Sequence, residues 1–487
     1  MPVATLEFRR YICAHWIPDH SQKAAAMKPT ILFLLALTFL SCAGPPKREG
    51  KGFRNDNNGW VFIHCEGSPR ERGYQHGVLL ADEIEDVLTV MAGFVNATTH
   101  KEWSFYRDAA ERMFWPKLEP EYQEEIEGIV AGLRARGKEY DRLDITALNG
   151  WIELGWYYIP SLAQRVKADS LENRAPGNCS AFIATGTYTA DGKIVMAHNA
   201  WVDYVVGQRW NVIMDLVPAR GNRMLMDCIP GTIHSGDDFV ISNAGLLITE
   251  TTITQFKGFL EDGVPEFARA RTAAQYARSI DEFVTIMAAE NNGGYANTWL
   301  VGDLKTNEIA MLDLGLKHQT LWRTNDGVFV GSNFATDERI IAEETTFNAA
   351  DSMNSANTRR KRWGQIMDQQ KGRITAELAM QFLADHGEAH GGPPVLNGRV
   401  LCGHNDRDSL GIPEWSNPPY YPTGAVQGKV TTATLASNLQ LWARMGHPCG
   451  TEFIAANFLT AHPEYKWQEL YLKDMKPNPW TLFSAKR

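Results

Sequence analysis

Two short stretches decide how this chain is expected to fold: PGNCSAFI at residues 176–183 and HNAWVDY at residues 198–204. The residues after Cys179 are mostly small, β-branched or aromatic, as is typical of a strand. An Asp-Gly pair at positions 191–192 is a strong signal for a hairpin turn. The sequence therefore predicts a β-hairpin that brings His198 and its neighbours close to Cys179.

The stretch before the hairpin gives Cys179 a special position. Residues 166–178 are polar, and such a surface segment is the natural place for a chain cut. A cut between Asn178 and Cys179 would give Cys179 a free α-amine, whose reference pKa is about 7.7–8.0. That amine could act as the general base for the thiol of its own residue. Without a cut, a lone cysteine is normally a small buried apolar residue.

Composition limits the class of protein. The chain has 487 residues, of which 44% are hydrophobic and 22% are charged, as in ordinary globular proteins. Its net charge is −9 and it has no basic patch with interleaved aromatic residues, so no nucleic-acid partner is predicted. The 15 tryptophans are spread along the chain and are expected in the core or in the walls of an apolar pocket.

The N-terminal part resembles an export signal. An apolar run at residues 31–40 follows a short basic start at Met27 and precedes Ser41-Cys42-Ala43-Gly44. Leu40-Ser41-Cys42 is similar to a bacterial lipobox, so we expect a signal over residues 1–42, lipidation of Cys42 and a membrane-anchored, exported protein. The polar residues 43–59 would be a tether. An ordinary secretory signal with an incidental Cys42 is the alternative.

The remaining cysteines leave three alternatives open. The chain has seven in all: Cys13, Cys42, Cys65, Cys179, Cys228, Cys402 and Cys449. In an exported protein Cys402 and Cys449 could form a disulfide, or both could be unpaired buried thiols. The sequences Cys-Gly-His at 402–404 and His-Pro-Cys at 447–449 also suggest zinc, but their spacing fits no common pattern. No metal site and no cofactor are therefore predicted.

Local signals divide the rest of the chain into a helical part and a mixed part. Ser68, Pro69 and Glu71 form a helix start with a capping box. The glycines of GYQHG at residues 73–77 are costly in a helix, so close packing against another element is expected there. Residues 121–136 and 148–162 are further predicted helices. After residue 179, strands and helices occur in blocks, which favours an α+β fold.

Several motifs together resemble one family. GNCSA at 177–181 and HNAWVDY at 198–204 look like the nucleophile region of the phospholipase B-like family of N-terminal nucleophile hydrolases. PGTIHSGDDF at 230–239 and GLLITETT at 245–252 are similar to the next stretches of that family, and residues 292–299 and 429–431 also fit. GSP at 67–69 with GYQHG resembles the penicillin acyltransferase-like (C45) group of the same superfamily. The resemblance begins near Val61.

This resemblance implies a four-layer αββα sandwich that cleaves itself before Cys179. A helical pro-segment over residues 60–178 and a catalytic domain over 179–487 would stay associated after the cut. The implied reaction is hydrolysis of an acyl amide or ester through a thioester on Cys179. The implied catalytic residues are Cys179 as nucleophile, His198 and Asp203 around the amine, and Asn297 in an oxyanion hole. The implied substrate-binding residues are Asn199, Trp201, Asp238, Glu250, Thr251 and Arg359.

Several of these residues also have a simpler structural interpretation. His198 could be a satisfied core histidine, Asn297 a loop amide, and the basic residues 359–362 a solvated helix face. Two other functions are also kept open. One is an acyltransferase or amidase that acts on N-acylated small molecules or peptides. The other is a non-catalytic surface lipoprotein that binds lipid.

Overall fold

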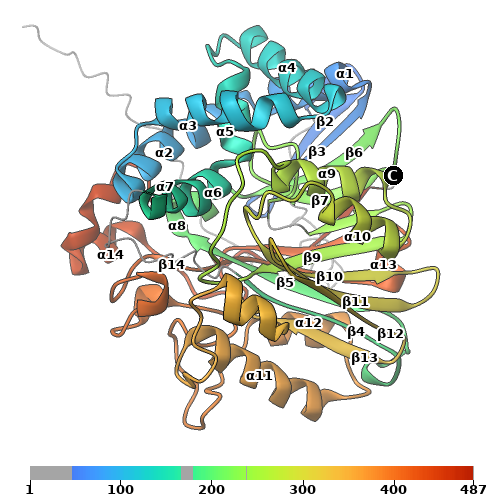
Figure 1. Ribbon diagram of the computed structural model, residues 1–487, viewed down its shortest axis with the longest axis vertical. Helices are drawn as coiled ribbons and strands as arrows, with labels where there is room; N and C mark the ends of the chain where they lie inside the picture. The colour runs from blue at the N-terminus through green and yellow to red at the C-terminus, as the bar shows by residue number, and fades with distance from the viewer. Residues whose placement is uncertain (1–46, 166–178, 237–238, 486–487) are drawn as a thin grey trace, which may run out of the picture. The chain divides into compact units, whose positions relative to one another are not determined.

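The computed structural model describes residues 47–165, 179–236 and 239–485 (Figure 1). The predicted signal segment with Cys42, the cleavage-site residue Asn178 and the predicted substrate-binding residue Asp238 lie outside these ranges.

Two β-sheets organise the described residues. The larger has ten strands in the order β1-β2-β3-β6-β7-β8-β9-β10-β11-β12, and the smaller has six in the order β13-β4-β5-β14-β15-β16. The strands of the larger sheet are β1 (Lys47–Glu49), β2 (Gly52–Asn57), β3 (Trp60–Gly67), β6 (Val212–Pro218), β7 (Met224–Cys228), β8 (Val240–Ser242), β9 (Leu246–Thr252), β10 (Asn297–Asp303), β11 (Glu308–Leu314) and β12 (Gln319–Thr324). Those of the smaller sheet are β13 (Gly327–Gly331), β4 (Cys179–Thr185), β5 (Val195–Asp203), β14 (Thr423–Thr432), β15 (Gln440–Met445) and β16 (Thr481–Ser484).

Helices pack around the sheets in three groups along the chain. Those before Cys179 are α1 (Pro69–Leu79), α2 (Ala81–Thr99), α3 (Trp103–Ala109), α4 (Pro120–Ala135), α5 (Arg142–Asn149), α6 (Trp151–Glu153) and α7 (Ile159–Arg165). The middle group is α8 (Tyr204–Gly207), α9 (Glu266–Tyr276) and α10 (Ile280–Ala288). The last group is α11 (Ser355–Gln370), α12 (Ala376–Leu383), α13 (Ala433–Ala436) and α14 (Ala455–Ala461).

The two sheets share an apolar core. Ile183 of β4 and Ile194, just before β5, lie so close to Gly302 of β10 that a Cβ there would be 3.0 Å and 3.2 Å from them. On the other face of the smaller sheet, Phe182 contacts Trp363 of α11 and Phe382 of α12, with ring centroids 5.4 Å and 6.0 Å apart. The chain is therefore a mixed α+β protein with two sheets and many helices, as predicted.

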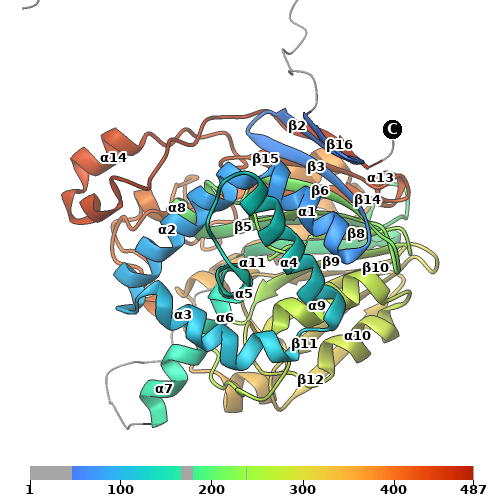
Figure 2. The ribbon, with the colours of Figure 1, turned by 90° about the horizontal axis from the view of Figure 1, so that it is seen from above.

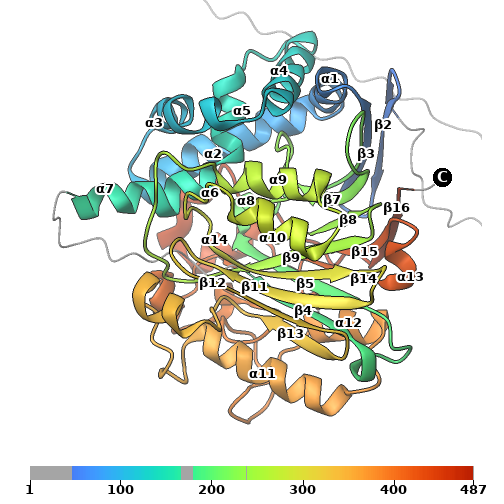
Figure 3. The ribbon, with the colours of Figure 1, turned by 45° about the vertical axis from the view of Figure 1, so that its right-hand side comes forward.

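Helices also cover the larger sheet. Phe283 of α10 packs on Trp299 of β10, with ring centroids 5.5 Å apart. Figure 3 shows α9 and α10 on one side of this sheet, and α11 on the far side of the smaller one. Within the ranges given above, no helix is both long and apolar enough to cross a bilayer.

The hairpin predicted around Cys179 is confirmed. Strands β4 and β5 are antiparallel, with Cys179 opposite Ala200 and Ala181 opposite His198. The turn between them contains Gly192 at a φ of 72°, a conformation that glycine adopts without strain. This register fixes Cys179 at the first position of β4, next to the segment that carries His198.

The predicted start of α1 is also confirmed, and its glycines have a packing role. Ser68 and Glu71 form the capping box, with Pro69 as the first helical residue. A Cβ on Gly73 would lie 2.0 Å from the carbonyl oxygen of Glu125 in α4, and one on Gly77 would lie 2.2 Å from that of Ile129. Only glycine permits the two helices to approach this closely.

One local prediction was wrong. Residues 47–57, predicted to be part of a tether, form β1 and β2, because β2 pairs with the edge of β3 and β1 pairs with β2. Figure 2 shows β2 beside β3. The helix predicted over residues 148–162 is largely confirmed: α6, a π-helical segment at Leu154–Tyr158 and α7 follow one another without a gap, while residues 148–149 end α5.

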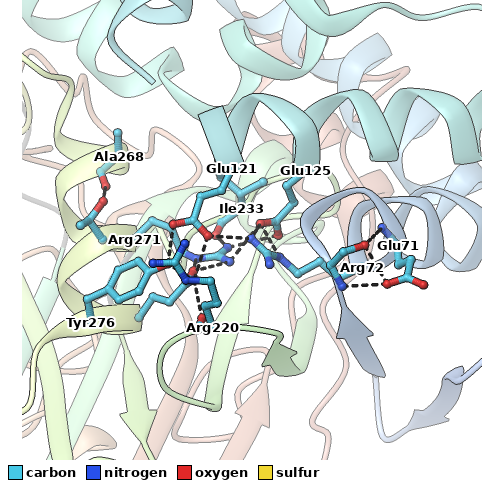
Figure 4. Close-up of polar contacts among 12 residues, drawn as sticks. Glu71, Arg72, Glu121, Glu125, Arg220, Ile233, Ala268, Arg271 and Tyr276 are labelled. Atoms are coloured by element: carbon cyan, nitrogen blue, oxygen red, sulfur yellow. Dashed lines mark hydrogen bonds and ion pairs between the residues drawn. The ribbon is translucent and has the colours of Figure 1, made fainter. Parts of the chain in front are cut away.

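A buried ion network connects the N-terminal helices to α9. Glu125 of α4 accepts hydrogen bonds from Arg72 Nε of α1 at 2.7 Å and from Arg271 Nη2 of α9 at 3.0 Å (Figure 4). Their side chains are at most 3% exposed. Burial opposes the charge of Glu125, but Arg271 and Arg72 together hold its carboxyl pKa below the ordinary value. The network therefore joins elements on either side of Cys179 in the sequence.

Candidate active site

Cys179 is held through its main chain as well as its side chain. Its main-chain nitrogen donates to Asn333 Oδ1 at 3.1 Å, and its carbonyl oxygen accepts from Arg359 Nη1 at 2.5 Å. Its Sγ lies 3.8 Å from Glu250 Oε1. The residue is 1% exposed. Buried polar groups therefore fix the nitrogen, the carbonyl group and the thiol of this one residue.

Strand pairing brings Asn333 to this position. β13 is antiparallel to β4, with Gly331 opposite Ala181, so the chain leaves β13 beside Cys179. Asn333 then adopts a φ of 70°, in the left-handed region that asparagine tolerates better than most residues. Its Nδ2 donates to the carbonyl oxygen of Thr252 in β9 at 3.1 Å. Asn333 thus connects β4 to the larger sheet.

Arg359 lies on the first turns of α11 and is fully buried. It also donates to Ser180 Oγ at 3.1 Å and to Asn333 Oδ1 at 2.9 Å. Its guanidinium lies over the rings of Trp201 and Trp415, at 4.3 Å and 5.4 Å from their centroids. Burial lowers its pKa to about 9, so Arg359 remains charged at neutral pH. A fixed positive charge therefore lies against the backbone of Cys179.

His198 and Glu250 complete a close group with Cys179. The thiol sulfur, an imidazole nitrogen and a carboxylate oxygen of these residues all lie within 4.8 Å of one another. Tyr295 donates its hydroxyl to Glu250 Oε1 at 2.9 Å. The predicted proximity of His198 to Cys179 is thus observed. The group is close enough to exchange a proton, and its donor atoms are also of the kind that bind a small cation.

Two further predicted residues are buried and carry polar side-chain atoms that lack a hydrogen bond to another described residue. Asn297 is the first residue of β10 and pairs with Thr252, while Thr251 pairs with Thr298. The side-chain amide of Asn297 and the hydroxyl of Thr251 make no hydrogen bond to another described residue. Because buried polar groups are normally paired, such atoms are available to a bound molecule.

Other predicted residues bond elsewhere. Asp203 forms a side-chain hydrogen bond with Tyr421, and burial raises the pKa of its carboxyl to about 6. Asn199 Nδ2 donates to the carbonyl oxygens of Leu383 and Leu401 at 2.7 Å and 3.1 Å. Trp201 Nε1 also donates to Leu401, at 3.3 Å. Asn199 therefore holds the loop after α12, whereas Trp201 holds that loop and also lies under Arg359.

Sequence reasoning missed Asn333 and Tyr295. The signal for Asn333 was the polar Gly-Ser-Asn run at residues 331–333, which follows the apolar residues 328–330. The signal for Tyr295 was its position after two glycines, where it adopts a φ of 46°. Neither signal indicates which residue the side chain will hydrogen-bond, because Cys179 and Glu250 lie far away in the sequence.

These contacts define a buried cysteine site in a mixed α+β protein. The cysteine is the first residue of β4 in the smaller sheet, and its thiol lies near Glu250 of β9 in the larger sheet. A family model described as Phospholipase B matches residues 83–383, and the chain belongs to this family. The predicted resemblance to the phospholipase B-like family is therefore confirmed.

Three curated relatives show the extent of the similarity. An uncharacterized protein of Archaeoglobus fulgidus is 27% identical over 299 residues, which is 58% of this chain and 49% of the relative. Phospholipase B-like 1 of Rattus norvegicus is 24% identical over 344 residues, 61% of this chain and 58% of the relative. The human protein of the same name is 30% identical over 138 residues, 26% of this chain and 25% of the relative. The chain thus spans about half the length of the first two relatives.

Proposed function

We propose that this protein is a lipid hydrolase that cleaves itself before Cys179 and then attacks acyl esters or amides with the Cys179 thiol. The observation that carries the proposal is the position of Cys179. It is the first residue of β4, and Asn333 and Glu250 contact its nitrogen and its thiol. Membership of the phospholipase B family supports a lipid substrate.

The proposal includes the fold class of N-terminal nucleophile hydrolases. Core contacts between the two sheets, with α9 and α10 outside one sheet and α11 and α12 outside the other, support a four-layer αββα sandwich. In that class the nucleophile is the first residue of a strand, where its amine and side chain can both reach a substrate.

In the uncut chain, Glu250 would act as the base. It takes the thiol proton of Cys179, and the sulfur attacks the carbonyl carbon of Asn178. The bond between that carbon and the Cys179 nitrogen breaks, and the nitrogen takes up the proton. Water then hydrolyses the thioester, which leaves a new carboxylate on Asn178 and a free amine and thiol on Cys179.

In turnover, the freed amine would replace Glu250 as the base. It takes the thiol proton while a bond forms between Sγ and the acyl carbon, and it returns the proton to the leaving alcohol or amine. Water, deprotonated by the same amine, then releases the fatty acid. Asn333 would orient the amine, and the unpaired amide of Asn297 would donate to the oxyanion. One such donor typically contributes about 3–4 kcal/mol to transition-state stabilisation.

The two fragments would remain one particle. β3 pairs with β6 over seven residue pairs, from Val61 with Val212 to Gly67 with Pro218. Glu125 of the first fragment is bound to Arg271 of the second. We propose that the small chain ends at Asn178 and contains the pro-segment of residues 60–178, and that residues 179–487 are the large chain.

Export and lipidation of Cys42 remain part of the proposal, on the strength of the Leu-Ser-Cys motif. Partition of the purified full-length protein into a detergent phase, lost in Cys42→Ala, would support the anchor. Partition that is unchanged in Cys42→Ala would exclude it.

The test combines intact mass, N-terminal sequencing and release of fatty acid from phosphatidylcholine and from an N-acyl amine. The wild type is expected to give a fragment beginning at Cys179 and to release fatty acid. Cys179→Ala is expected to stay uncut, with activity reduced at least 10³-fold, because both steps need the thiol. Glu250→Gln is expected to stay uncut for lack of a base.

Two other buried residues provide matched controls, Cys228→Ala and Glu153→Gln. Both are expected to be cut as in the wild type. An uncut wild-type chain that still hydrolyses lipid would contradict self-activation. Transfer of the acyl group to an added amine would favour the acyltransferase, and lipid binding without turnover would favour the binding lipoprotein.

A further inference from the structure

Four metal-ligating side chains from two connections of the chain meet at one place beside β5. His386 follows α12, Cys402 and His404 lie in the loop that leads to β14, and Cys449 follows β15. One imidazole nitrogen or thiol sulfur of each residue lies within 4.8 Å of those of the other three. Cys402 and His404 are buried, and His386 and Cys449 are half-buried. The site lies outside residues 83–383, the part of the chain that the family model matches.

Two distances between these atoms match the edges of a tetrahedral ligand shell. Zinc–nitrogen bonds of about 2.0–2.1 Å and zinc–sulfur bonds of about 2.3 Å give tetrahedron edges of about 3.4 Å between two nitrogens and about 3.6 Å between nitrogen and sulfur. The Nε2 atoms of His386 and His404 are 3.2 Å apart, and His404 Nε2 is 3.5 Å from Cys449 Sγ. The side chains are therefore already close to the arrangement that one zinc ion would require.

The surroundings of Cys449 suit a thiolate ligand. The main-chain nitrogen of Thr451 donates to Cys449 Sγ at 3.3 Å, and the Thr451 hydroxyl lies 3.1 Å from the same sulfur. Hydrogen bonds of this kind to ligand atoms stabilise and orient metal ligands. Two thiolates and two neutral imidazoles also balance the charge of one divalent cation, so the buried group would be neutral.

We propose that His386, Cys402, His404 and Cys449 bind one structural zinc ion. Four protein ligands leave no open position, which is the mark of a structural and not a catalytic zinc site. Soft sulfur with imidazole nitrogen in a tetrahedral set favours zinc over magnesium or calcium.

The ion would hold both ends of residues 386–404, and the segment after β15, against β5. Gly403, between two of the ligands, has a φ of 57°, and a Cβ there would lie 2.3 Å from the Trp201 ring. Asn199 of β5 binds the carbonyl oxygen of Leu401 on the same loop. The ion would therefore support Trp201, on which Arg359 rests.

A second group shares His404 and has to be separated from the first. His404, Asp406 and His447 also bring their ligand atoms within 4.8 Å of one another. Asp406, however, accepts a hydrogen bond from the Tyr204 hydroxyl at 2.7 Å, and this group has no sulfur ligand. His447→Asn is therefore the control variant for His386→Asn.

The experiment measures zinc in the full-length protein, purified without a polyhistidine tag or chelator, together with its free thiols after denaturation. About one zinc per chain is expected, with Cys402 and Cys449 both reactive to a thiol reagent. His386→Asn and Cys449→Ser are expected to lose at least 10-fold of the bound zinc, while His447→Asn retains it. Cobalt added to the zinc-free protein should give thiolate-to-metal charge-transfer absorption.

Two results would overturn the proposal. One is a wild-type protein without zinc, whether Cys402 and Cys449 are joined in a disulfide or free. The other is zinc that is kept in His386→Asn and lost in His447→Asn. The zinc content and the free thiols of the wild-type protein test the proposal even if a variant fails to fold.

Discussion

Two fully buried arginines, Arg271 and Arg359, are surrounded in opposite ways. Arg271 binds a carboxylate, Glu125, which it shares with Arg72. Arg359 makes no ion pair with a described residue and donates to neutral oxygens of Cys179, Ser180 and Asn333. A buried charge paired with its counter-charge stabilises the fold, whereas a buried charge directed at the backbone of the proposed nucleophile indicates a functional site. The distinction depends on the partner and not on burial.

Breaking the paired network should have the largest effect on stability. Glu125→Gln leaves Arg72 and Arg271 without a full counter-charge, and removal of one partner of a buried pair costs about 3–5 kcal/mol. The free energy of unfolding in urea should fall by that amount, while kcat of the folded protein stays within about 2-fold of the wild type. Glu124→Gln, at an exposed neighbouring position, should change neither. A loss of kcat in Glu125→Gln without a loss of stability would contradict the assignment of this network to the fold.

Removing the other arginine should act mainly on the reaction. Arg359→Met is expected to lower kcat about 100-fold, as the loss of one preorganised donor does, through a displaced Cys179 backbone. Stability should change by less than about 2 kcal/mol, because the lost hydrogen bonds are offset by no longer burying an unpaired charge.

Arg360→Met, at the exposed neighbour on α11, is the matched control and should keep wild-type kcat. Arg359→Lys should recover part of the activity if position matters, since lysine retains the charge without the planar fork. An Arg359→Met enzyme with full kcat and lowered stability would show that Arg359 is structural after all.

The smallest expected effect is that of substituting Asp203, and it is a change in stability that depends on pH. Its carboxyl pKa is about 6 in the fold against about 3.9 in an unfolded chain, so the folded state favours the protonated form. The buried carboxylate therefore destabilises the fold increasingly from about pH 4 to pH 6, and fully above that range.

Asp203→Asn should accordingly be more stable than the wild type at pH 7, by about 1–2 kcal/mol, and equal to it near pH 3.5. Urea unfolding at the two pH values measures the difference. Because Asp203 bonds Tyr421, kcat should stay within about 3-fold of the wild type. A large loss of kcat would return Asp203 to the catalytic group.

Local signals predicted the framework of the fold. The Asp-Gly turn at 191–192, the cap at Ser68 and the glycines of α1 each depend on neighbours in sequence or on a backbone preference. The first strands were missed because residues 47–57 have little strand character of their own and become ordered only by pairing with β3.

The candidate site was predictable only in part. Cys179, His198, Glu250 and Arg359 were named through motifs, and the structure places all four together. Asn333 and Tyr295 were not, because their role arises from contacts across 154 and 45 residues of sequence. Of the four proposed zinc ligands, Cys402, His404 and Cys449 stood in motifs that suggest zinc, but their spacing fitted no common pattern and His386 was not named.

The parallel pairing of β3 with β6 has a consequence for how the protein is made. If residues 179–487 were synthesised alone, β6 would be an unprotected sheet edge, and such edges recruit other chains. Residues 179–487 on their own should therefore aggregate, and later addition of the N-terminal part should not rescue them. Synthesis of both parts as one polypeptide covers the edge of β6 from the start, so the proposed cut would have to follow closure of the sheet.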